Sequence, residues 1–183
     1  MDTFKFTTPP DFNKIPQFPH CNYRVDVAWD YLEYQIAVEE EAGLDLNPDF
    51  QRGHVWTKEQ QTAYVEYILR GGQSGKELYF NCADFSRGNE GLYVIVDGKQ
   101  RLQAVRQFMR DEVPAFGYLR SEYSGNMRGL FLRFSWNVAA LKTRAEVLKW
   151  YLAFNSGGSV HTQEELCRVR QLLEQERENG GAA

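Results

Sequence analysis

The stretch YVIVDGKQRLQAV, residues 93–105, joins a short apolar run to a polar turn and then to an amphipathic segment. Its first four residues predict a buried strand, and Gly98 permits a tight turn directly after it. The spacing of Leu102 and Val105 predicts a helix that begins at about Lys99. A strand that runs into a helix in this way presents the unpaired amides and the positive dipole end of the helix beyond the strand.

Two interpretations of this corner are open on the residues alone. Lys99 and Arg101 place two positive charges on the first helical turn, and one guanidinium can hold two phosphate oxygens. The corner therefore suits an anion, although many strand-to-helix corners carry a basic residue without any ligand. Asp97 is either a helix cap or a carboxylate that positions phosphate-bound Mg²⁺.

The composition predicts one folded domain over residues 1–183. The chain is 43% hydrophobic and 14% aromatic, which supplies a core and argues against a largely disordered chain. No apolar run approaches the roughly 20 residues of a membrane helix, and the start lacks a secretory signal. Cys21, Cys82 and Cys167 lack metal-site spacing and are expected to be buried, reduced thiols. A cytoplasmic protein is the simplest expectation.

The expected strands and helices alternate irregularly. Residues 1–22 are rich in proline and should form an extended arm, and residues 176–183 should form a frayed tail. Strands are expected at residues 23–29, 76–82, 91–96, 112–119 and 129–134. Helices are expected at residues 30–43, 57–72, from 99 onward, 143–154 and from 162 onward. Because no regular βαβ period is present, the pattern predicts a compact α+β domain with a small mixed sheet and packed helices.

Three capping boxes mark expected helix starts, because each pairs a threonine with Gln or Glu three residues later. They are Thr57 with Gln60, Thr143 with Glu146, and Thr162 with Glu165. In the first expected helix, Leu32, Ile36 and Val38 should lie on or near the inner face.

The segment GGQSGKEL, residues 71–78, resembles a phosphate-binding loop but should not be one. Its glycine spacing is one residue short, and Glu77 stands where Ser or Thr is required. The order is also helix, loop, strand, whereas helix amides meet phosphates only when a strand precedes the helix. We expect a plain connection here.

Two further polar patches carry open alternatives. In FQRGHVW, Gln51, Arg52, His54 and Trp56 crowd together before a helix, and Arg52 could equally pair with an acid while Trp56 anchors that helix. A lone histidine is usually not catalytic, so His54 is not expected to be.

In FNSGGS, Asn155 follows a helix, and Gly157 and Gly158 permit positive φ angles. These residues suit an anion-binding nest of backbone amides, or simply a turn between two helices.

The charge is uneven along the chain. The net charge is −4, with three basic and ten acidic side chains in residues 1–50. Residues 120–149 are basic and form either a face for a polyanion or an ordinary solvated face. The basic side chains there are Arg120, Arg128, Arg133, Lys142, Arg144 and Lys149.

Three segments in one order, FQRGHVWTKEQQ, VDGKQRLQAV and FNSGGSVHTQEEL, resemble a known family. They are similar to the domain of unknown function 262 (DGQQR-motif) family, found in restriction systems and written QR-x-x-W … DGQQR … F-N-x-x-G. That family belongs to the ParB/sulfiredoxin-like superfamily, and the resemblance covers residues 24–175. It implies a ParB/sulfiredoxin-like fold for this chain.

The resemblance also implies a nucleotide site. GKQRLQA fits the ParB-type G-x-x-R-x-x-A motif that receives a nucleotide triphosphate, and Lys99 departs from the usual Gln. Asp97, Gln100 and Arg101 are the implied catalytic residues, and Mg²⁺ is implied near Asp97 through the nucleotide phosphates. The implied nucleotide-binding residues are Gln51, Arg52, Gly98, Lys99, Arg101, Asn155, Gly157 and Gly158.

The implied activity is nucleoside triphosphate binding and hydrolysis in restriction, phage–host conflict or DNA metabolism. Family members typically carry a second, His-containing nuclease domain, and His20, His54 and His161 cannot supply such a centre, so a stand-alone domain is expected. Three rivals are a nucleotide-dependent kinase, a DNA nickase with residues 120–149 as its DNA face, and a non-enzymatic nucleotide-sensing or inhibitory partner. DNA, a DNA-processing protein and a second copy of the chain are the candidate partners.

Overall fold

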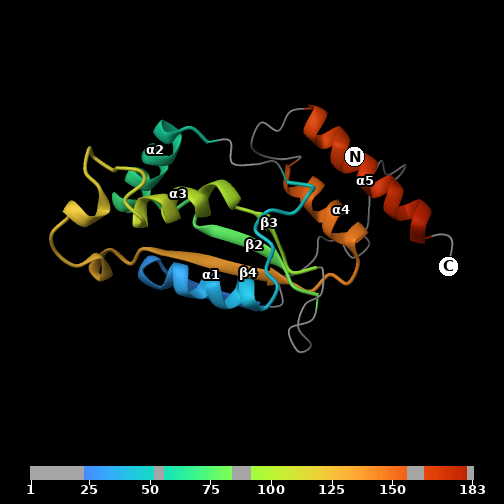
Figure 1. The fold of residues 1–183 in the computed structure, drawn as a ribbon, viewed down its shortest axis with the longest axis horizontal. Coiled ribbons are helices and arrows are strands. Elements are labelled where there is room, and N and C mark those ends of the chain that lie inside the picture. The colour runs from blue at the N-terminus through green and yellow to red at the C-terminus, as the bar shows by residue number, and fades with distance from the viewer. Residues whose placement is uncertain (1–22, 52–55, 84–91, 156–162, 181–183) are drawn as a thin grey trace, which may run out of the picture.

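The computed structural model describes residues 23–51, 56–83, 92–155 and 163–180 (Figure 1). The helices are α1 (Leu32–Glu41), α2 (Lys58–Leu69), α3 (Lys99–Met109), α4 (Arg144–Asn155) and α5 (Gln163–Gly180). The strands are β1 (Tyr23–Ala28), β2 (Glu77–Asn81), β3 (Val94–Asp97) and β4 (Arg133–Ala139). Within these described residues, no helix is long and apolar enough to cross a membrane.

The four strands form one mixed sheet in the order β1-β4-β2-β3. β1 and β4 are antiparallel, β4 and β2 are parallel, and β2 and β3 are antiparallel. The other edge of β3 is partly covered because Asp45 donates to Tyr93 O at 2.8 Å and accepts from Ile95 N at 3.1 Å. The mixed sheet with its packed helices confirms the predicted α+β class.

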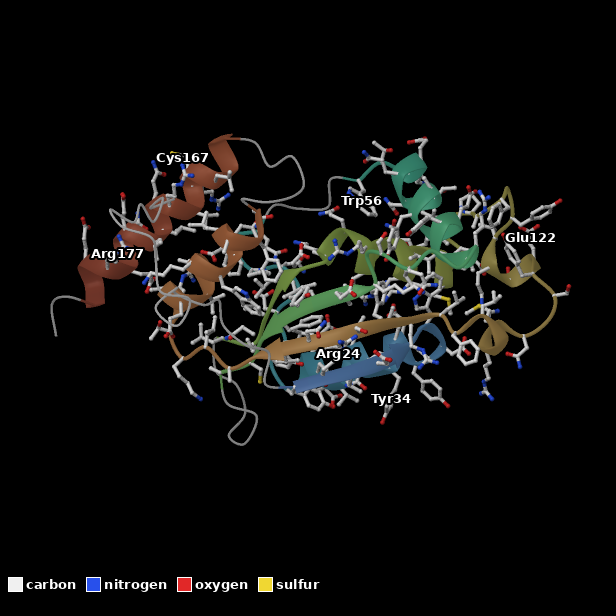
Figure 2. All side chains as sticks on the ribbon, turned by 180° about the vertical axis from the view of Figure 1, so that it is seen from behind. Arg24, Tyr34, Trp56, Glu122, Cys167 and Arg177 are labelled. Carbon is white, nitrogen blue, oxygen red and sulfur yellow. The ribbon has the colours of Figure 1, made fainter. Side chains whose placement is uncertain are left out.

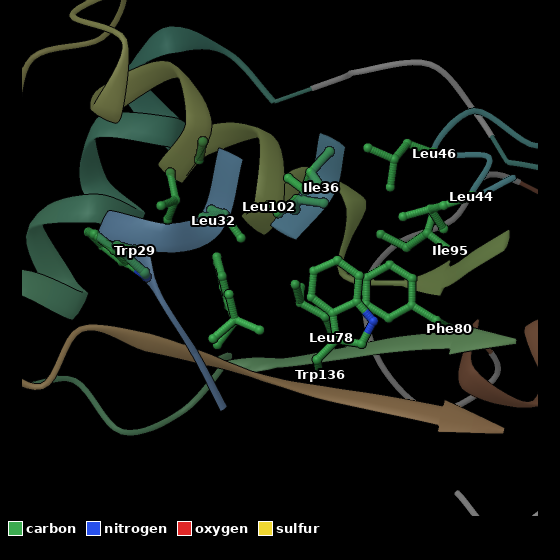
Figure 3. Packing of buried hydrophobic residues seen from close by; sticks show 14 of the residues in the cluster. Trp29, Leu32, Ile36, Leu44, Leu46, Leu78, Phe80, Ile95, Leu102 and Trp136 are labelled. Atoms are coloured by element: carbon green, nitrogen blue, oxygen red, sulfur yellow. The ribbon is translucent and has the colours of Figure 1, made fainter. Parts of the chain in front are cut away.

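β3 lies between two layers of helices, so both of its faces are buried. Tyr93 and Ile95 belong to the larger apolar cluster, which fills the space between the sheet and α1, α2 and α3 (Figure 3). Val94 and Val96 belong to a second cluster formed with α4 and α5. Burying such a side chain contributes about 1.5–3 kcal/mol each, so β3 is a rigid support for the corner that follows it.

The predicted helix starts agree with the structure where they are described. Thr57 and Gln60 form the capping box of α2, and Thr143 and Glu146 form the corresponding bonds before α4. The residue Thr162 lies outside the described residues. Leu32 and Ile36 are buried in α1, but the prediction for Val38 was wrong because its side chain is 42% exposed.

Two strand predictions were wrong in the connection between α3 and β4. Residues 112–119 form a tight turn, in which Ala115 and Tyr118 exchange backbone hydrogen bonds of 2.9 and 3.0 Å. The segment 129–134 is strand only from Arg133, because a 3-10 turn precedes it and Phe131 has a φ of 50°. A left-handed residue ends the turn and cannot belong to a strand.

Two smaller expectations also differ from the structure. Helix α5 continues to Gly180, four residues beyond the expected start of the frayed tail at residue 176. Cys82 is buried as predicted, whereas Cys167 on α5 is exposed; Cys21 lies outside the described residues.

Candidate functional site

The corner between β3 and α3 is built around Gly98. Gly98 has a φ of 99° and precedes the first helical residue, and its carbonyl accepts the first helical bond from Leu102 N at 2.9 Å. A Cβ at this position would lie 2.4 Å from Leu78 Cδ2, so any other residue would strain the backbone and displace the Leu78 side chain. The amides of the first turn therefore lie at the positive end of α3, against the carboxyl end of a buried strand.

Arg101 returns from the first turn of α3 to this corner. Its Nη2 donates to Asp97 Oδ2 at 2.7 Å and to the Glu77 backbone carbonyl at 3.0 Å. Its Nε is buried and has no acceptor among the described residues. Asp97 thus pairs with Arg101 and does not cap the helix, which decides against the capping interpretation.

A pocket of about 80 Å³ opens at the amino end of α3. It combines the strand-to-helix corner with residues from the segment before α2 and from the end of α4. Its lining residues are Gln51, Trp56, Val96, Asp97, Gly98, Lys99, Gln100, Arg101, Tyr151 and Asn155.

Two glutamines connect the segment before α2 to the corner. Gln51 Nε2 donates to the carbonyls of Ile95 and Val96, at 2.7 and 2.9 Å. Gln100 Oε1 accepts from Trp56 N at 3.2 Å. Through these bonds, Gln51 and Trp56 lie together at one wall of the pocket. Arg52 and His54 lie outside the described residues.

Asn155 and Tyr151 form the wall contributed by α4. Asn155 Nδ2 donates to Tyr151 O at 2.7 Å, and the Tyr151 ring packs edge-on against Phe50 at 5.2 Å. The packing fixes the last turn of α4 beside the corner. Gly157 and Gly158, the other residues of this motif, lie outside the described residues.

Lys99 is half-buried at the start of α3. Burial lowers the pKa of its ammonium below the ordinary lysine value, and the nearby Asp45 carboxylate opposes that shift. A lysine whose charged form is disfavoured by desolvation gains from a phosphate that restores a counter-charge.

No group of three or more His, Cys, Asp and Glu side chains could hold a metal ion within the described part of the chain. Among the described residues that line the pocket, Asp97 is the one carboxylate. Mg²⁺ is commonly held by one or two carboxylates together with substrate phosphates, and Asp97 could supply one such carboxylate.

The basic residues of the 120–149 segment are divided between the two ends of β4. Arg120 and Arg128 lie before the strand, and Arg133 begins it at 3.8 Å from Asp26. A seven-residue strand spans about 20 Å, and Lys142 and Arg144 follow its far end.

Both residues at that far end have partners. Lys142 donates to Ala83 O, and Arg144 bonds both carboxylate oxygens of Asp49 at 2.9 and 2.7 Å. Arg144 also lies 3.5 Å from Glu176 of α5, so it joins α5 to the domain. The structure does not bring the predicted basic residues together on one face.

A family model for the N-terminal domain of GmrSD restriction endonuclease matches residues 35–176. The chain belongs to this family. The matched region includes every residue of the pocket, and membership links this GmrSD-type domain to restriction endonucleases and phage–host conflict. No curated protein and no solved structure shows a significant match to the chain.

Sequence reasoning missed two contributors to the site of this GmrSD-type domain, Glu77 and Tyr151. Glu77 contributes a backbone carbonyl that accepts from Arg101, and no side-chain pattern predicts such a contact. Tyr151 had a usable signal, since it precedes Asn155 by four residues on a helix and must share its face.

Proposed function

We propose that this domain binds a nucleoside triphosphate by its phosphates at the β3–α3 corner and hydrolyses it with Mg²⁺. One observation carries the proposal. Three motifs far apart in the sequence, represented by Gln51, Asp97 to Arg101, and Asn155, line one pocket at the amino end of a helix. The superfamily relation to ParB and sulfiredoxin, implied by the motif resemblance, belongs to the same proposal.

The volume of the pocket suits phosphate and not a whole nucleotide. Pockets that bury drug-sized molecules measure roughly 300–1,000 Å³. At about 80 Å³, this pocket takes a phosphoryl group, and the sugar and base of a nucleotide would extend past Trp56 and Tyr151.

Arg101 can exchange its present partner for phosphate at small cost. The side chains of Arg101 and Asp97 are 23% and 33% exposed, and a pair so accessible to water contributes about 0–1 kcal/mol. The buried Nε of Arg101 has no acceptor among the described residues, and an unsatisfied donor costs about 1–3 kcal/mol. A phosphate that accepts from both Nη2 and Nε would outcompete Asp97.

The residues divide the chemistry as follows. Arg101, Lys99 and the first-turn amides stabilise negative charge on the phosphoryl oxygens, which strengthens as the bond to the leaving phosphate breaks. Asp97, released from Arg101, orients the attacking water. Gln100 has its Oε1 on the Trp56 amide, so we assign it to positioning the segment before α2. Mg²⁺ bound with the nucleotide would neutralise further phosphate charge beside Asp97.

The biological setting follows from the family. We propose that nucleotide binding at this corner serves a DNA-directed restriction reaction in phage–host conflict. Hydrolysis would release inorganic phosphate, a kinase would transfer the γ-phosphate to another acceptor, and a binding module would form no product. The reaction product therefore distinguishes the three.

Calorimetric titration with ATP, GTP and CTP in the presence of Mg²⁺ tests this proposal. Arg101→Ala removes a charge-assisted contact worth about 1.5–3 kcal/mol, so affinity should fall by about tenfold or more. Arg70→Ala is the matched control, since Arg70 is an exposed arginine that ends α2.

If a nucleotide binds and only Arg101→Ala weakens it, phosphate release and labelled-product transfer then distinguish hydrolysis from phosphotransfer. If no nucleotide binds the wild type at millimolar concentration, the proposal is wrong and protein partners become the question.

A further inference from the structure

The connection between α3 and β4 lies at the end of the sheet remote from α4 and α5 (Figure 1). Several large apolar side chains are exposed there. Ten large apolar side chains are exposed among the described residues, and five of them lie in this short segment. We call these five the aromatic surface: Phe116, Tyr118, Tyr123, Leu130 and Phe131. In Figure 2, Glu122 of this segment lies at one end of the molecule, and Cys167 and Arg177 of α5 lie at the other.

Two of these rings belong to residues with an uncommon backbone conformation. Asp111, Phe116 and Phe131 have φ values of 62°, 49° and 50°, and no other described non-glycine residue has a positive φ. A bulky residue in this region is rare and is typically retained where a site needs it. Phe116 and Phe131 thus combine an exposed ring with an uncommon backbone conformation.

A hollow of about 250 Å³ lies within the aromatic surface. Phe108, Phe116 and Tyr123 contribute rings to it, and Phe108 and Tyr123 meet edge-to-face with centroids 6.1 Å apart. Arg120 and Asn126 add polar groups to its lining. Its volume is below the roughly 300–1,000 Å³ of pockets for drug-sized molecules, so it suits one flat ring system.

A second hollow of about 210 Å³ adjoins the first, because Met127 lines both. It contains Arg128 together with Phe131, and the Arg133 guanidinium lies over the Phe131 ring at 5.5 Å. Rings and guanidinium groups thus alternate along the segment.

Two arginines of this segment are available to an anionic partner. The nearby carboxylates have local backbone partners: Asp111 accepts from Ser121 N at 2.8 Å, Glu122 from Leu119 N at 2.6 Å, and Glu66 of α2 from Phe116 N at 2.7 Å. Arg120 and Arg128 form no ion pair with any described residue, in contrast to Arg110, which pairs with Glu33. Positive charge therefore stays available beside the rings.

We propose that the aromatic surface binds single-stranded DNA, with one unpaired base stacked in the hollow and phosphates on Arg120 and Arg128. Bases stack on aromatic rings whatever their identity, while arginines follow the backbone. Membership of a restriction endonuclease family makes DNA the nucleic acid in question. The site is separate from the β3–α3 corner and does not depend on nucleotide binding there.

Fluorescence anisotropy with a labelled single strand of about 12 nucleotides, and with the duplex of the same sequence, tests the stacking. The single strand should bind more tightly than the duplex. Phe116→Ala should weaken single-strand binding roughly five- to hundredfold. The control is Tyr34→Ala, which removes an exposed ring from α1 (Figure 2).

The salt dependence of binding tests the arginines. Removing one phosphate contact lowers the slope of log K against log salt by about 0.7 for single strands. Arg120→Gln and Arg128→Gln should each have this effect, while Arg170→Gln on α5 and Arg101→Ala should leave it unchanged. An unchanged slope for Arg101→Ala would show that DNA binding does not depend on the nucleotide site.

The proposal is overturned if the wild type binds no single strand, or if Phe116→Ala binds it as the wild type does. A change in self-association on Phe116→Ala, without any change in DNA affinity, would equally overturn it and assign the surface to a protein interface.

Discussion

Two corners that contain glycine, residues 71–77 and 97–101, have similar residue types but opposite directions. Each combines glycine, lysine and an acidic residue, and only the second runs from strand into helix. In the first, Gly71 N donates to Ile68 O at 2.9 Å and Gly72 N to Tyr67 O at 3.0 Å. Those amides close the end of α2, where the helix dipole is negative.

The second corner leaves its amides at the positive end of α3, and Arg101 returns to them. The composition of the two corners therefore does not identify the candidate anion site. The direction of the chain, from strand into helix, identifies it. Each of the following predictions pairs a residue of the 97–101 corner with its counterpart at the other corner.

The largest expected difference concerns the two glycines with positive φ. Gly98 and Gly71 have φ values of 99° and 86°, so alanine is strained at both, by about 1–2 kcal/mol. At Gly98 the new Cβ would also meet Leu78 Cδ2 at 2.4 Å, and overpacking adds about 1–3 kcal/mol. Gly98→Ala should thus lower the free energy of unfolding by about 2–5 kcal/mol, measured by urea denaturation.

The matched variant isolates the packing contribution. A Cβ at Gly71 would meet no atom within 4 Å, so Gly71→Ala should cost only the strain. Equal losses for the two variants would show that Leu78 moves aside without cost and that the corner is not tightly packed.

A second difference concerns the acids, Asp97 and Glu77. Asp97→Asn should tighten phosphate binding in the absence of Mg²⁺ by about five- to tenfold, because it releases Arg101 and removes a negative charge from the pocket. Added Mg²⁺ should then strengthen nucleotide binding to the wild type and not to the variant. Calorimetry with and without Mg²⁺ measures both effects.

Glu77→Gln is the control, because Arg101 uses the backbone carbonyl of Glu77 and not its carboxylate. Weaker phosphate binding by Asp97→Asn without Mg²⁺ would contradict the exchange and mean that Asp97 is needed to orient Arg101.

Local sequence signals predicted the elements that their own residues specify. The capping boxes of Thr57 and Thr143 and the corner at Gly98 depend on residues close in sequence, and they lie where expected. The segments 112–119 and 129–134 were mistaken for strands because their apolar runs mix buried residues with exposed ones, among them Phe116, Tyr118 and Phe131. Apolar composition alone cannot distinguish a surface ring from a core residue.

The candidate site was also predictable in part. The polarity of strand and helix identified the α3 corner, and the motif resemblance selected Gln51 and Asn155, which line the same pocket. The contact of Arg101 with the Glu77 carbonyl was not predictable, because it depends on where β2 lies beside β3.

The smallest expected difference concerns the lysines, Lys99 and Lys76. Burial lowers the pKa of Lys99, so as pH rises from neutral this lysine loses its charge before an ordinary lysine with a pKa of 10.5 does. Phosphate affinity of the wild type should therefore fall as pH rises through the lowered pKa. Lys99→Gln, which restores the residue of the family pattern, should weaken binding about two- to fivefold near neutral pH, since Lys99 is only half-buried and its charge is partly screened. That variant should also lose this part of the pH dependence, whereas Lys76→Gln should keep it. Calorimetric titrations from neutral to alkaline pH measure both, and an unchanged pH profile in Lys99→Gln would remove Lys99 from the phosphate site.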